Sequence, residues 1–272
     1  MPDESTPDTN GAVVTVDFVR HRNVLLVQGD LSPVFTDYYL HLADHHLRCT
    51  PEQDAIFKGA LAAFTLHCAS RPRGEHIAWT VNFQQPLLNL FLTGDNEDSL
   101  VAGRVFTDNV KEAEHNVFYS DIVPIRGARP RRSIVPFQGA DAIAMAEQYY
   151  RQSEQRPARY FDLGEDRFAL AIGHPDCDER WLAGLDPADL PGAVGRAVLA
   201  RIERRSYEWR CGCNHQRILA TLTAAAKDDL MGLFGDDESV RLSCPRCAAH
   251  YVVTREALEA FIEHRMKQQG GA

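Results

Sequence analysis

The chain has 272 residues, of which 44% are hydrophobic and 25% charged, and its formal net charge is −9 at pH 7. These proportions are ordinary for a globular protein with a substantial core, and the acidic balance argues against broad affinity for nucleic acid. No run of eighteen apolar residues occurs and the first residues are polar and acidic, so we expect neither a membrane span nor a secretory signal.

The first part of the chain is predicted to contain a strand and two helices. Residues 13–28 have a strand-like pattern, and the Ser-Pro pair at 32–33 is typical of the start of a helix, here 34–46. At 50–53, Thr-Pro-Glu-Gln forms a capping box with proline at the first helical position, and apolar residues then recur on one helical face. A second, well-defined helix is therefore expected there.

Beyond residue 74 the hydrophobic period changes to that of a strand. Ile77, Trp79, Val81 and Phe83 alternate with mostly polar residues, as on a half-buried strand. Three more strands are predicted between acidic or polar turns, at 87–93, 100–106 and 116–123. This succession predicts an antiparallel sheet.

A helix at about 141–153 and two strands at 159–163 and 167–172, joined by a Gly-Glu-Asp turn, complete the predicted body. Because helices interrupt the strands irregularly, the pattern favours the α+β class over a doubly wound sheet. We expect a mixed, largely antiparallel sheet with packed helices, followed by a small C-terminal zinc-binding module that is itself α+β.

Changes in composition predict the domain organisation. Residues 1–12 are expected to be a disordered leader and 13–175 an α+β core domain. Residues 176–205 begin rich in Pro, Gly and Asp, end in a short predicted helix at 193–204, and are interpreted as a linker. The remaining residues, 206–272, contain four of the seven cysteines and form the predicted zinc-binding domain.

The C-terminal domain is predicted to combine helices and short strands. A helix is expected at 216–234, strands at 239–243 and 250–253, and a last helix that Thr254 caps. A unit this small is not held together by burial alone, so metal binding should supply much of its folding free energy.

Four cysteines of this domain have the spacing of a zinc site. Cys211 and Cys213 form a C-x-C pair, and Cys244 and Cys247 form a C-x-x-C pair thirty residues further on. Two local pairs suit one tetrahedral Zn²⁺, because only one loop has to be closed between them. We predict Zn²⁺ as the cofactor and these cysteines as its ligands. An odd total of seven cysteines that includes such a set favours a reducing compartment, the cytoplasm.

Other interpretations of these cysteines stay open. The four can be structural residues that bind nothing, although packing cysteines rarely come in such pairs. A purely structural zinc ribbon would instead dock a partner protein or nucleic acid, and the even balance of nine basic and nine acidic residues in 205–272 weakens the nucleic-acid version. The segment 244–247 also has the form of a thiol–disulfide oxidoreductase motif, which leaves the C-x-C pair without a role.

The remaining cysteines have structural interpretations. Cys49 and Cys68 are expected to be packing or surface residues, and Cys177 is the one placed to be an accessory thiol. No motif for nucleotide hydrolysis, serine chemistry or metalloprotease activity occurs, so the sequence does not indicate an enzyme.

Histidine and arginine clusters are also assigned ordinary roles. His41 and His45, four residues apart, are expected on a solvated helix face, and His215 beside the metal ligands without being one. The basic run at 126–132 is expected to be a solvated loop.

Several segments resemble the Hsp33 family of bacterial chaperones. Its C-terminal redox switch is similar to Tyr207–Cys213 (YEWRCGC), to the helix containing Asp228-Asp229-Leu230, and to Leu242–Tyr251 (LSCPRCAAHY). Its Y-x-x-S-E-Q-x-P segment is similar to Tyr149–Pro157 (YYRQSEQRP), and an apolar-Val-Pro turn that precedes it is similar to Ile134-Val135-Pro136.

This resemblance implies a cytoplasmic, ATP-independent stress-response holdase that is dormant when reduced and zinc-loaded. Oxidation would release the metal, pair Cys211 with Cys213 and Cys244 with Cys247, and unfold the zinc domain and linker. Apolar surface would then bind unfolded or aggregation-prone client proteins, and the oxidised chain would form a homodimer. Nucleic acid and membrane are not expected partners.

Overall fold

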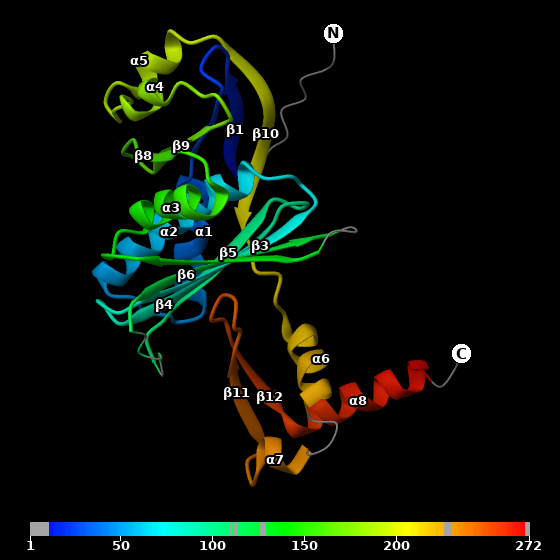
Figure 1. The fold of residues 1–272 in the computed structure, drawn as a ribbon. Helices are drawn as coiled ribbons and strands as arrows, with labels where there is room; N and C mark the ends of the chain where they lie inside the picture. The colour runs from blue at the N-terminus through cyan, green and yellow to red at the C-terminus, as the bar shows by residue number, and fades with distance from the viewer. Residues whose placement is uncertain are drawn as a thin grey trace.

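The computed structural model describes residues 11–269 apart from 109, 111, 113, 126–128 and 226–229. Its centre is a ten-stranded sheet with the strand order β7-β6-β3-β4-β5-β10-β1-β2-β9-β8 (Figure 1). Neighbouring strands are antiparallel except for the short parallel pairing of β10 with β5. With the helices packed on it, this sheet confirms the α+β class.

The elements of the body form three groups, which are the strands on each side of the sheet and the helices. The strands on the β1 side of the sheet are β1 (Ala12–Val19), β2 (Val24–Asp30), β8 (Ala158–Asp162), β9 (Arg167–Gly173) and β10 (Leu199–Trp209). Those on the other side are β3 (Glu75–Phe83), β4 (Leu88–Asp95), β5 (Leu100–Phe106), β6 (Asn116–Pro124) and β7 (Arg131–Phe137). The helices of the body are α1 (Ser32–Asp44), α2 (Pro51–Ala69), α3 (Ala142–Tyr149), the π-helix Tyr150–Glu154, α4 (Glu179–Ala183) and α5 (Leu190–Gly195).

Helix α2 begins as its capping box predicts. The Gln53 backbone N–H donates to Thr50 Oγ1 at 3.2 Å, and the Thr50 N–H donates to Gln53 Oε1 at 2.9 Å. These reciprocal bonds satisfy donors that have no partner inside the helix. The C-terminal half of α2 is buried in the main core, where Phe64 packs edge-on against Trp79 with 5.1 Å between ring centroids.

Two short helices cover the opposite face of the β1 half-sheet. Successive residues of a strand face opposite sides, so Leu25 and Val27 of β2 join the main core while Leu26 faces a second, smaller core. Leu182 of α4 and Leu190, the first residue of α5, are buried in that second core. In Figure 1, α4 and α5 lie at the end of the molecule away from the C-terminal elements.

The helix predicted at 193–204 is wrong, because α5 ends at Gly195 and the chain then enters β10. Ala, Val and Leu at 197–200 are acceptable in a helix, but pairing along β1 from Ala12 to Val19 overrides this local preference. The alternation inside β10 is visible from its buried positions, Arg205, Tyr207 and Trp209. A strand of the body thus runs into the segment interpreted as a linker, while the domain boundary itself stays a prediction.

Two further expectations are corrected. The single strand predicted at 13–28 is a hairpin of β1 and β2, whose connection contains His21 and Asn23 with positive φ. The predicted turn at Ile134–Pro136 lies inside β7, where proline is tolerated because β7 is the last strand of the sheet. The predicted leader, 1–12, falls mostly outside the described residues, and Ala12 already belongs to β1.

The C-terminal elements form a separate small module with its own core. They are α6 (His215–Ala225), α7 (Leu230–Phe234), β11 (Ser239–Ser243), β12 (His250–Thr254) and α8 (Arg255–Gln269). As predicted, β11 and β12 pair on either side of the C-x-x-C turn, and Thr254 Oγ1 accepts from the Ala257 N–H at 3.1 Å at the start of α8. None of the helices in the described part of the chain is long and apolar enough to cross a membrane.

Candidate metal centre

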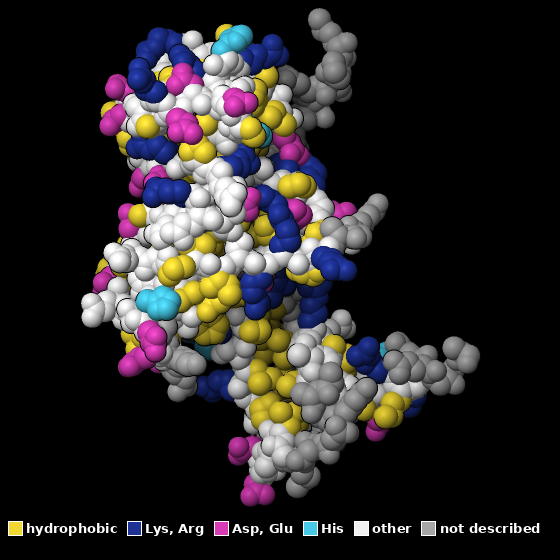
Figure 2. Space-filling model, in the orientation of Figure 1, with side chains coloured by type: hydrophobic (Ala, Val, Ile, Leu, Met, Phe, Trp, Pro, Cys, Tyr) yellow, Lys and Arg dark blue, Asp and Glu magenta, His cyan; other side chains and the backbone are white. Residues whose placement is uncertain are grey.

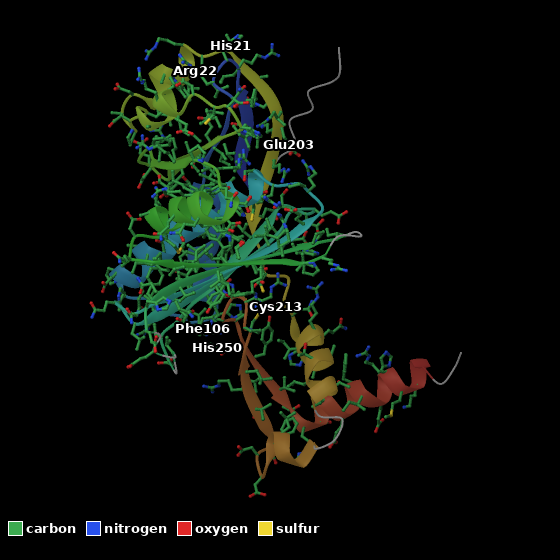
Figure 3. The ribbon with its side chains drawn as sticks, in the orientation of Figure 1. His21, Arg22, Phe106, Glu203, Cys213 and His250 are labelled. Atoms are coloured by element: carbon green, nitrogen blue, oxygen red, sulfur yellow. The ribbon has the colours of Figure 1, made fainter. Side chains whose placement is uncertain are left out.

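The fold brings the four predicted cysteines into one cluster. The sulfurs of Cys211, Cys213, Cys244 and Cys247 all lie within 4.8 Å of one another. The first pair follows directly after β10, and the second forms the turn between β11 and β12. Figure 3 shows Cys213 at the junction beneath the sheet, in the same region as Phe106 and His250.

The backbone at both pairs is shaped to point sulfurs inward. Gly212 has φ +68°, a conformation that costs a residue with a side chain about 1–2 kcal/mol. In the second pair the Ala248 N–H donates to the Cys244 carbonyl at 2.9 Å, and the Arg246 N–H donates to Cys244 Sγ at 3.4 Å. These bonds close a tight turn and leave the sulfurs on one side of it.

Hydrogen bonds within the cluster favour ionised sulfur at two positions. Bonding to Cys211 lowers the pKa of Cys213 to about 6, and Tyr251 Oη adds a donor 3.1 Å from Cys213 Sγ. Bonding to Cys211 also lowers the pKa of Cys244, whereas hydrogen bonds to the neighbouring sulfurs raise the pKa values of Cys211 and Cys247. Thiolates are the form in which cysteine binds a metal.

The donor set fits zinc. Cys211 Sγ lies 3.7 Å from Cys244 Sγ, and Cys213 Sγ lies 3.4 Å from Cys247 Sγ. A regular tetrahedron of sulfurs at the usual Zn–S distance of about 2.3 Å has edges of about 3.8 Å. Four soft ligands at this spacing suit Zn²⁺ better than a hard cation such as Mg²⁺. Their identity as ligands stays a prediction.

The body contacts the second cysteine pair directly, which the sequence did not predict. His41 Nε2 of α1 lies 2.8 Å from the Cys247 carbonyl oxygen, and Arg104 Nη1 of β5 donates to the Cys244 carbonyl at 3.0 Å. Arg246 Nη2 donates to Thr93 Oγ1 of β4 at 3.2 Å. The expectation of a solvated face is wrong for His41, because α1 lies against the cysteine turn.

The other histidine and arginine predictions have mixed outcomes. His45 stacks near His41 with 4.7 Å between ring centroids, and burial lowers its pKa. His215 is exposed at the start of α6, and its ring lies 6.5 Å from that of Tyr251, the donor to Cys213. Of the basic run at 126–132, the segment 126–128 lies outside the described residues, and Arg132 pairs with Asp121 at 2.6 Å.

The remaining cysteines lie away from the cluster. Cys68 is completely buried in the main core, as predicted, and burial raises the pKa of its thiol. Cys49 and Cys177 are half-buried, and burial also raises both pKa values. Nothing in this arrangement activates these thiols.

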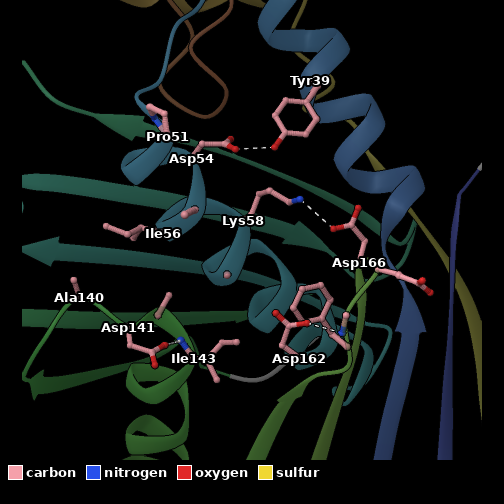
Figure 4. Close-up of a pocket in the computed structure, with 16 residues that line it drawn as sticks. Tyr39, Pro51, Asp54, Ile56, Lys58, Ala140, Asp141, Ile143, Asp162 and Asp166 are labelled. Atoms are coloured by element: carbon pink, nitrogen blue, oxygen red, sulfur yellow. Dashed lines mark hydrogen bonds and ion pairs between the residues drawn. The ribbon is translucent and has the colours of Figure 1, made fainter. Parts of the chain in front are cut away.

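A cavity of about 670 Å³ lies elsewhere, between α1, α2, α3 and the β8–β9 turn (Figure 4). Its polar side chains are engaged with one another. Asp54 accepts from Tyr39 Oη at 2.7 Å, Asp166 pairs with Lys58 Nζ at 3.0 Å, and Asp141 caps α3. These pairings hold elements together, and we assign the cavity no function.

Comparisons with known proteins agree on one family. A family model described as Hsp33 protein matches residues 179–254. The 33 kDa chaperonin of Proteus mirabilis (strain HI4320) is 23% identical over 268 residues, covering 85% of this chain and 90% of its own. The 33 kDa chaperonin of Yersinia pestis (strain Pestoides F) is 24% identical over 268 residues, covering 83% and 87%.

A solved structure extends the likeness to the fold. The crystal structure of the 33 kDa chaperonin (heat shock protein 33 homolog) of Thermotoga maritima matches with a TM-score of 0.72. The match covers 94% of this chain and 99% of that one at 16% sequence identity. The two proteins therefore share a fold across both the sheet and the C-terminal module.

Proposed function

Because this chain is a divergent member of the Hsp33 family of chaperones, we propose that it is an ATP-independent holdase that oxidation switches on. The observation that carries the proposal is the cluster of four cysteine sulfurs within 4.8 Å of one another at the end of β10. In the reduced protein, Cys211, Cys213, Cys244 and Cys247 would hold one Zn²⁺ and keep the client-binding surface covered.

The thiols of the C-x-C pair are open to small oxidants. Cys211 and Cys213 are half-buried, and two surface hollows of about 320 and 510 Å³ reach Cys211. When bound, zinc would stabilise the four thiolates and join the two cysteine pairs. Each disulfide forms when two thiols lose two electrons and two protons, while one hydrogen peroxide is reduced to two waters.

We propose the disulfides Cys211–Cys213 and Cys244–Cys247, which the family resemblance implies. Distance alone does not select a pairing, because all four sulfurs lie close together. Peptide mapping of the peroxide-treated protein by mass spectrometry would identify the pairs, and a Cys211–Cys244 link would contradict this proposal.

Oxidation would unfold the module because the hydrophobic core of the module is small. Among the residues whose burial the structure describes, its main hydrophobic cluster consists of Leu219, Leu222, Phe234, Val253 and Leu258. So small a core depends on the cross-link at the cysteines. Loss of the module would uncover Phe91 and Phe106 of the sheet, which line a hollow together with Pro245 of the module. Figure 2 shows further hydrophobic side chains, in yellow, on the body above the junction.

The decisive experiment measures zinc and holdase activity in the same samples. We expect one zinc per chain in the reduced protein, its loss on peroxide treatment, and suppression of citrate synthase aggregation only after oxidation. Reduction with dithiothreitol and zinc should restore the inactive state. If fully oxidised protein leaves citrate synthase turbidity unchanged, the holdase proposal is wrong.

The alternative is a structural zinc module that does not respond to oxidants, and the contacts of His41 and Arg104 with the cysteine turn favour it. This alternative predicts that zinc stays bound through peroxide treatment and that no holdase activity emerges. The same measurements therefore separate the two functions.

The partners follow from the proposed activity. We propose unfolded or aggregation-prone proteins as clients and a homodimer of the oxidised chain, with no role for nucleic acid, membrane or catalysis. The cytoplasm is the proposed location, because an odd total of seven cysteines that includes a zinc-type set suits a reducing compartment.

A further inference from the structure

Two side chains of the body bind the carbonyl groups of metal-ligand residues, and we propose that Arg104 and His41 are positioning residues for the metal centre. Arg104 Nη1 donates to the Cys244 carbonyl at 3.0 Å, and His41 Nε2 lies 2.8 Å from the Cys247 carbonyl oxygen. Since a carbonyl oxygen only accepts, His41 Nε2 carries the hydrogen. The inference rests on the proposed zinc site but not on chaperone activity.

The turn that carries Cys244 and Cys247 is held by hydrogen bonds within residues 244–249 and by a hydrogen bond from the body. Inside it, the Cys244 N–H donates to the Ala249 carbonyl at 2.8 Å, and the Cys244 carbonyl accepts the Ala248 N–H at 2.9 Å. The second lone pair of the same carbonyl accepts from Arg104. A shift of this peptide group would move Cys244 Sγ, so Arg104 restrains the sulfur through the backbone.

The surroundings of Arg104 support its contact with the Cys244 carbonyl. Its guanidinium lies over the ring of Phe106 at 4.0 Å from the centroid, and its side chain is half-buried on β5. Four thiolates around a divalent cation carry a net negative charge, which a neighbouring guanidinium stabilises. A lysine would keep the charge but not the planar stacking.

The first cysteine pair is anchored to the same part of the body. Trp209, two residues before Cys211, packs against the rings of His41 at 6.0 Å, Tyr38 at 5.2 Å and Phe57 at 6.0 Å between centroids. The body therefore fixes both cysteine pairs relative to each other. This coupling is reciprocal. If the contacts of the body raise the affinity of the cysteines for the metal, then metal binding stabilises those contacts by the same free energy.

The test compares zinc retention in matched variants of the full-length reduced protein. Arg104→Gln removes the charge and the Arg104 bond to Cys244. The control Arg132→Gln, on β7 of the same sheet, removes a guanidinium that pairs with Asp121. We expect zinc to pass to the chelator 4-(2-pyridylazo)resorcinol about tenfold faster from Arg104→Gln, at an intermediate rate from Arg104→Lys, and at the wild-type rate from Arg132→Gln. His41→Phe, which keeps an aromatic ring but removes the Nε2 donor to the Cys247 carbonyl, should also release zinc faster.

Hydrogen exchange distinguishes positioning from general destabilisation. In Arg104→Gln, we expect faster exchange at amides 244–249 and unchanged protection in α2. Equal zinc-release rates in wild type and Arg104→Gln, or equal loss of protection in α2, would overturn the inference. If the rates differ as expected but oxidised wild type does not suppress aggregation, the holdase proposal fails and the positioning role stands.

Discussion

At the scale of single residues, the body buries polar side chains around the C-terminal end of α2. His67 is completely buried, its Nδ1 lies 2.8 Å from Tyr150 Oη, and its Nε2 has no hydrogen-bond partner among the described residues. Its ring packs against Trp79 and Tyr149. Burial lowers the pKa of His67 well below its usual range, so the folded protein holds this side chain neutral.

This burial predicts a loss of stability in mild acid. The folded pKa of His67 is depressed, so the unfolded chain binds one proton more once the pH falls below the ordinary histidine pKa of about 6.5. The free energy of unfolding should then fall by up to about 1.4 kcal/mol per pH unit from this residue alone. Urea unfolding at pH 7.0 and 5.5 measures the slope, which should shrink in His67→Gln and persist in the exposed-residue control His21→Gln. An unchanged slope in His67→Gln would contradict the assignment.

At the scale of elements, β10 decides how the body and the module are joined. It pairs with β1 over most of its length and reaches β5 only at Glu208 and Trp209. Arg205 is 5% exposed, and its Nη2 donates to the Arg71 carbonyl at 2.8 Å and to Glu203 at 2.6 Å. The segment directly before the cysteines is therefore an integral strand of the sheet.

Removing the Arg205 guanidinium should destabilise the body. Arg205→Gln would remove the bonds from the buried guanidinium to Glu203 and the Arg71 carbonyl, while Arg73 still donates to Glu203. We expect the free energy of unfolding to fall by about 2 kcal/mol. The neighbouring exposed variant Arg204→Gln should stay within about 0.5 kcal/mol of wild type. Denaturant unfolding followed by far-UV circular dichroism measures both. A wild-type value for Arg205→Gln would contradict the stabilising role of this buried guanidinium.

The helices α4 and α5 form a cover over apolar strands, and their loosening should expose that surface. Leu182 is 2% exposed in the core beneath them. Leu182→Ala should lower stability by about 2–5 kcal/mol and raise bis-ANS binding in the reduced, zinc-loaded protein. Arg180→Ala, an exposed position of the same helix, is the control. If bis-ANS fluorescence of the reduced Leu182→Ala protein equals that of the control, the cover does not hide a binding surface.

At the scale of the whole molecule, the body and the C-terminal module, whose hydrophobic cores differ in size, meet at the cysteine cluster. The body has an extended core that joins both halves of the sheet to α1, α2 and α3, whereas the module has two small clusters. The contacts of Arg104, His41 and Arg246 connect the body and the module through the turn at Cys244–Cys247. We expect these contacts to transmit a local change at the four sulfurs to the body.

Metal removal should therefore unfold the module and leave the body folded. After treatment of reduced protein with EDTA, we expect hydrogen exchange to become fast in β11 and β12 while α2 and β1 keep their protection, because metal binding supplies the folding free energy of so small a unit. Adding back equimolar zinc should restore protection. Retention of protection in β11 and β12 after complete zinc loss would contradict this dependence.

The sequence alone was sufficient where the determinants are local. The Thr50–Gln53 capping box predicted the start of α2, period-two alternation predicted β3, and two close cysteine pairs predicted the cluster. The capping box and the strand alternation each lie within a few residues of the chain. The two cysteine pairs are recognisable because few other sequence patterns suit a metal site so well. The resemblance to Hsp33 also rested on short segments, chiefly those around the two cysteine pairs and Tyr149–Pro157.

Only the tertiary structure decided the features that depend on distant partners. The segment entering β10 is a strand because β1 offers a pairing edge, and β7 accepts Pro136 because it lies at the edge of the sheet. Arg104 and His41 carry no local motif, since their role arises only when β5 and α1 meet the turn at Cys244–Cys247. Local patterns determine which elements form and which ligands a metal finds, whereas burial and pairing between distant segments determine what surrounds them.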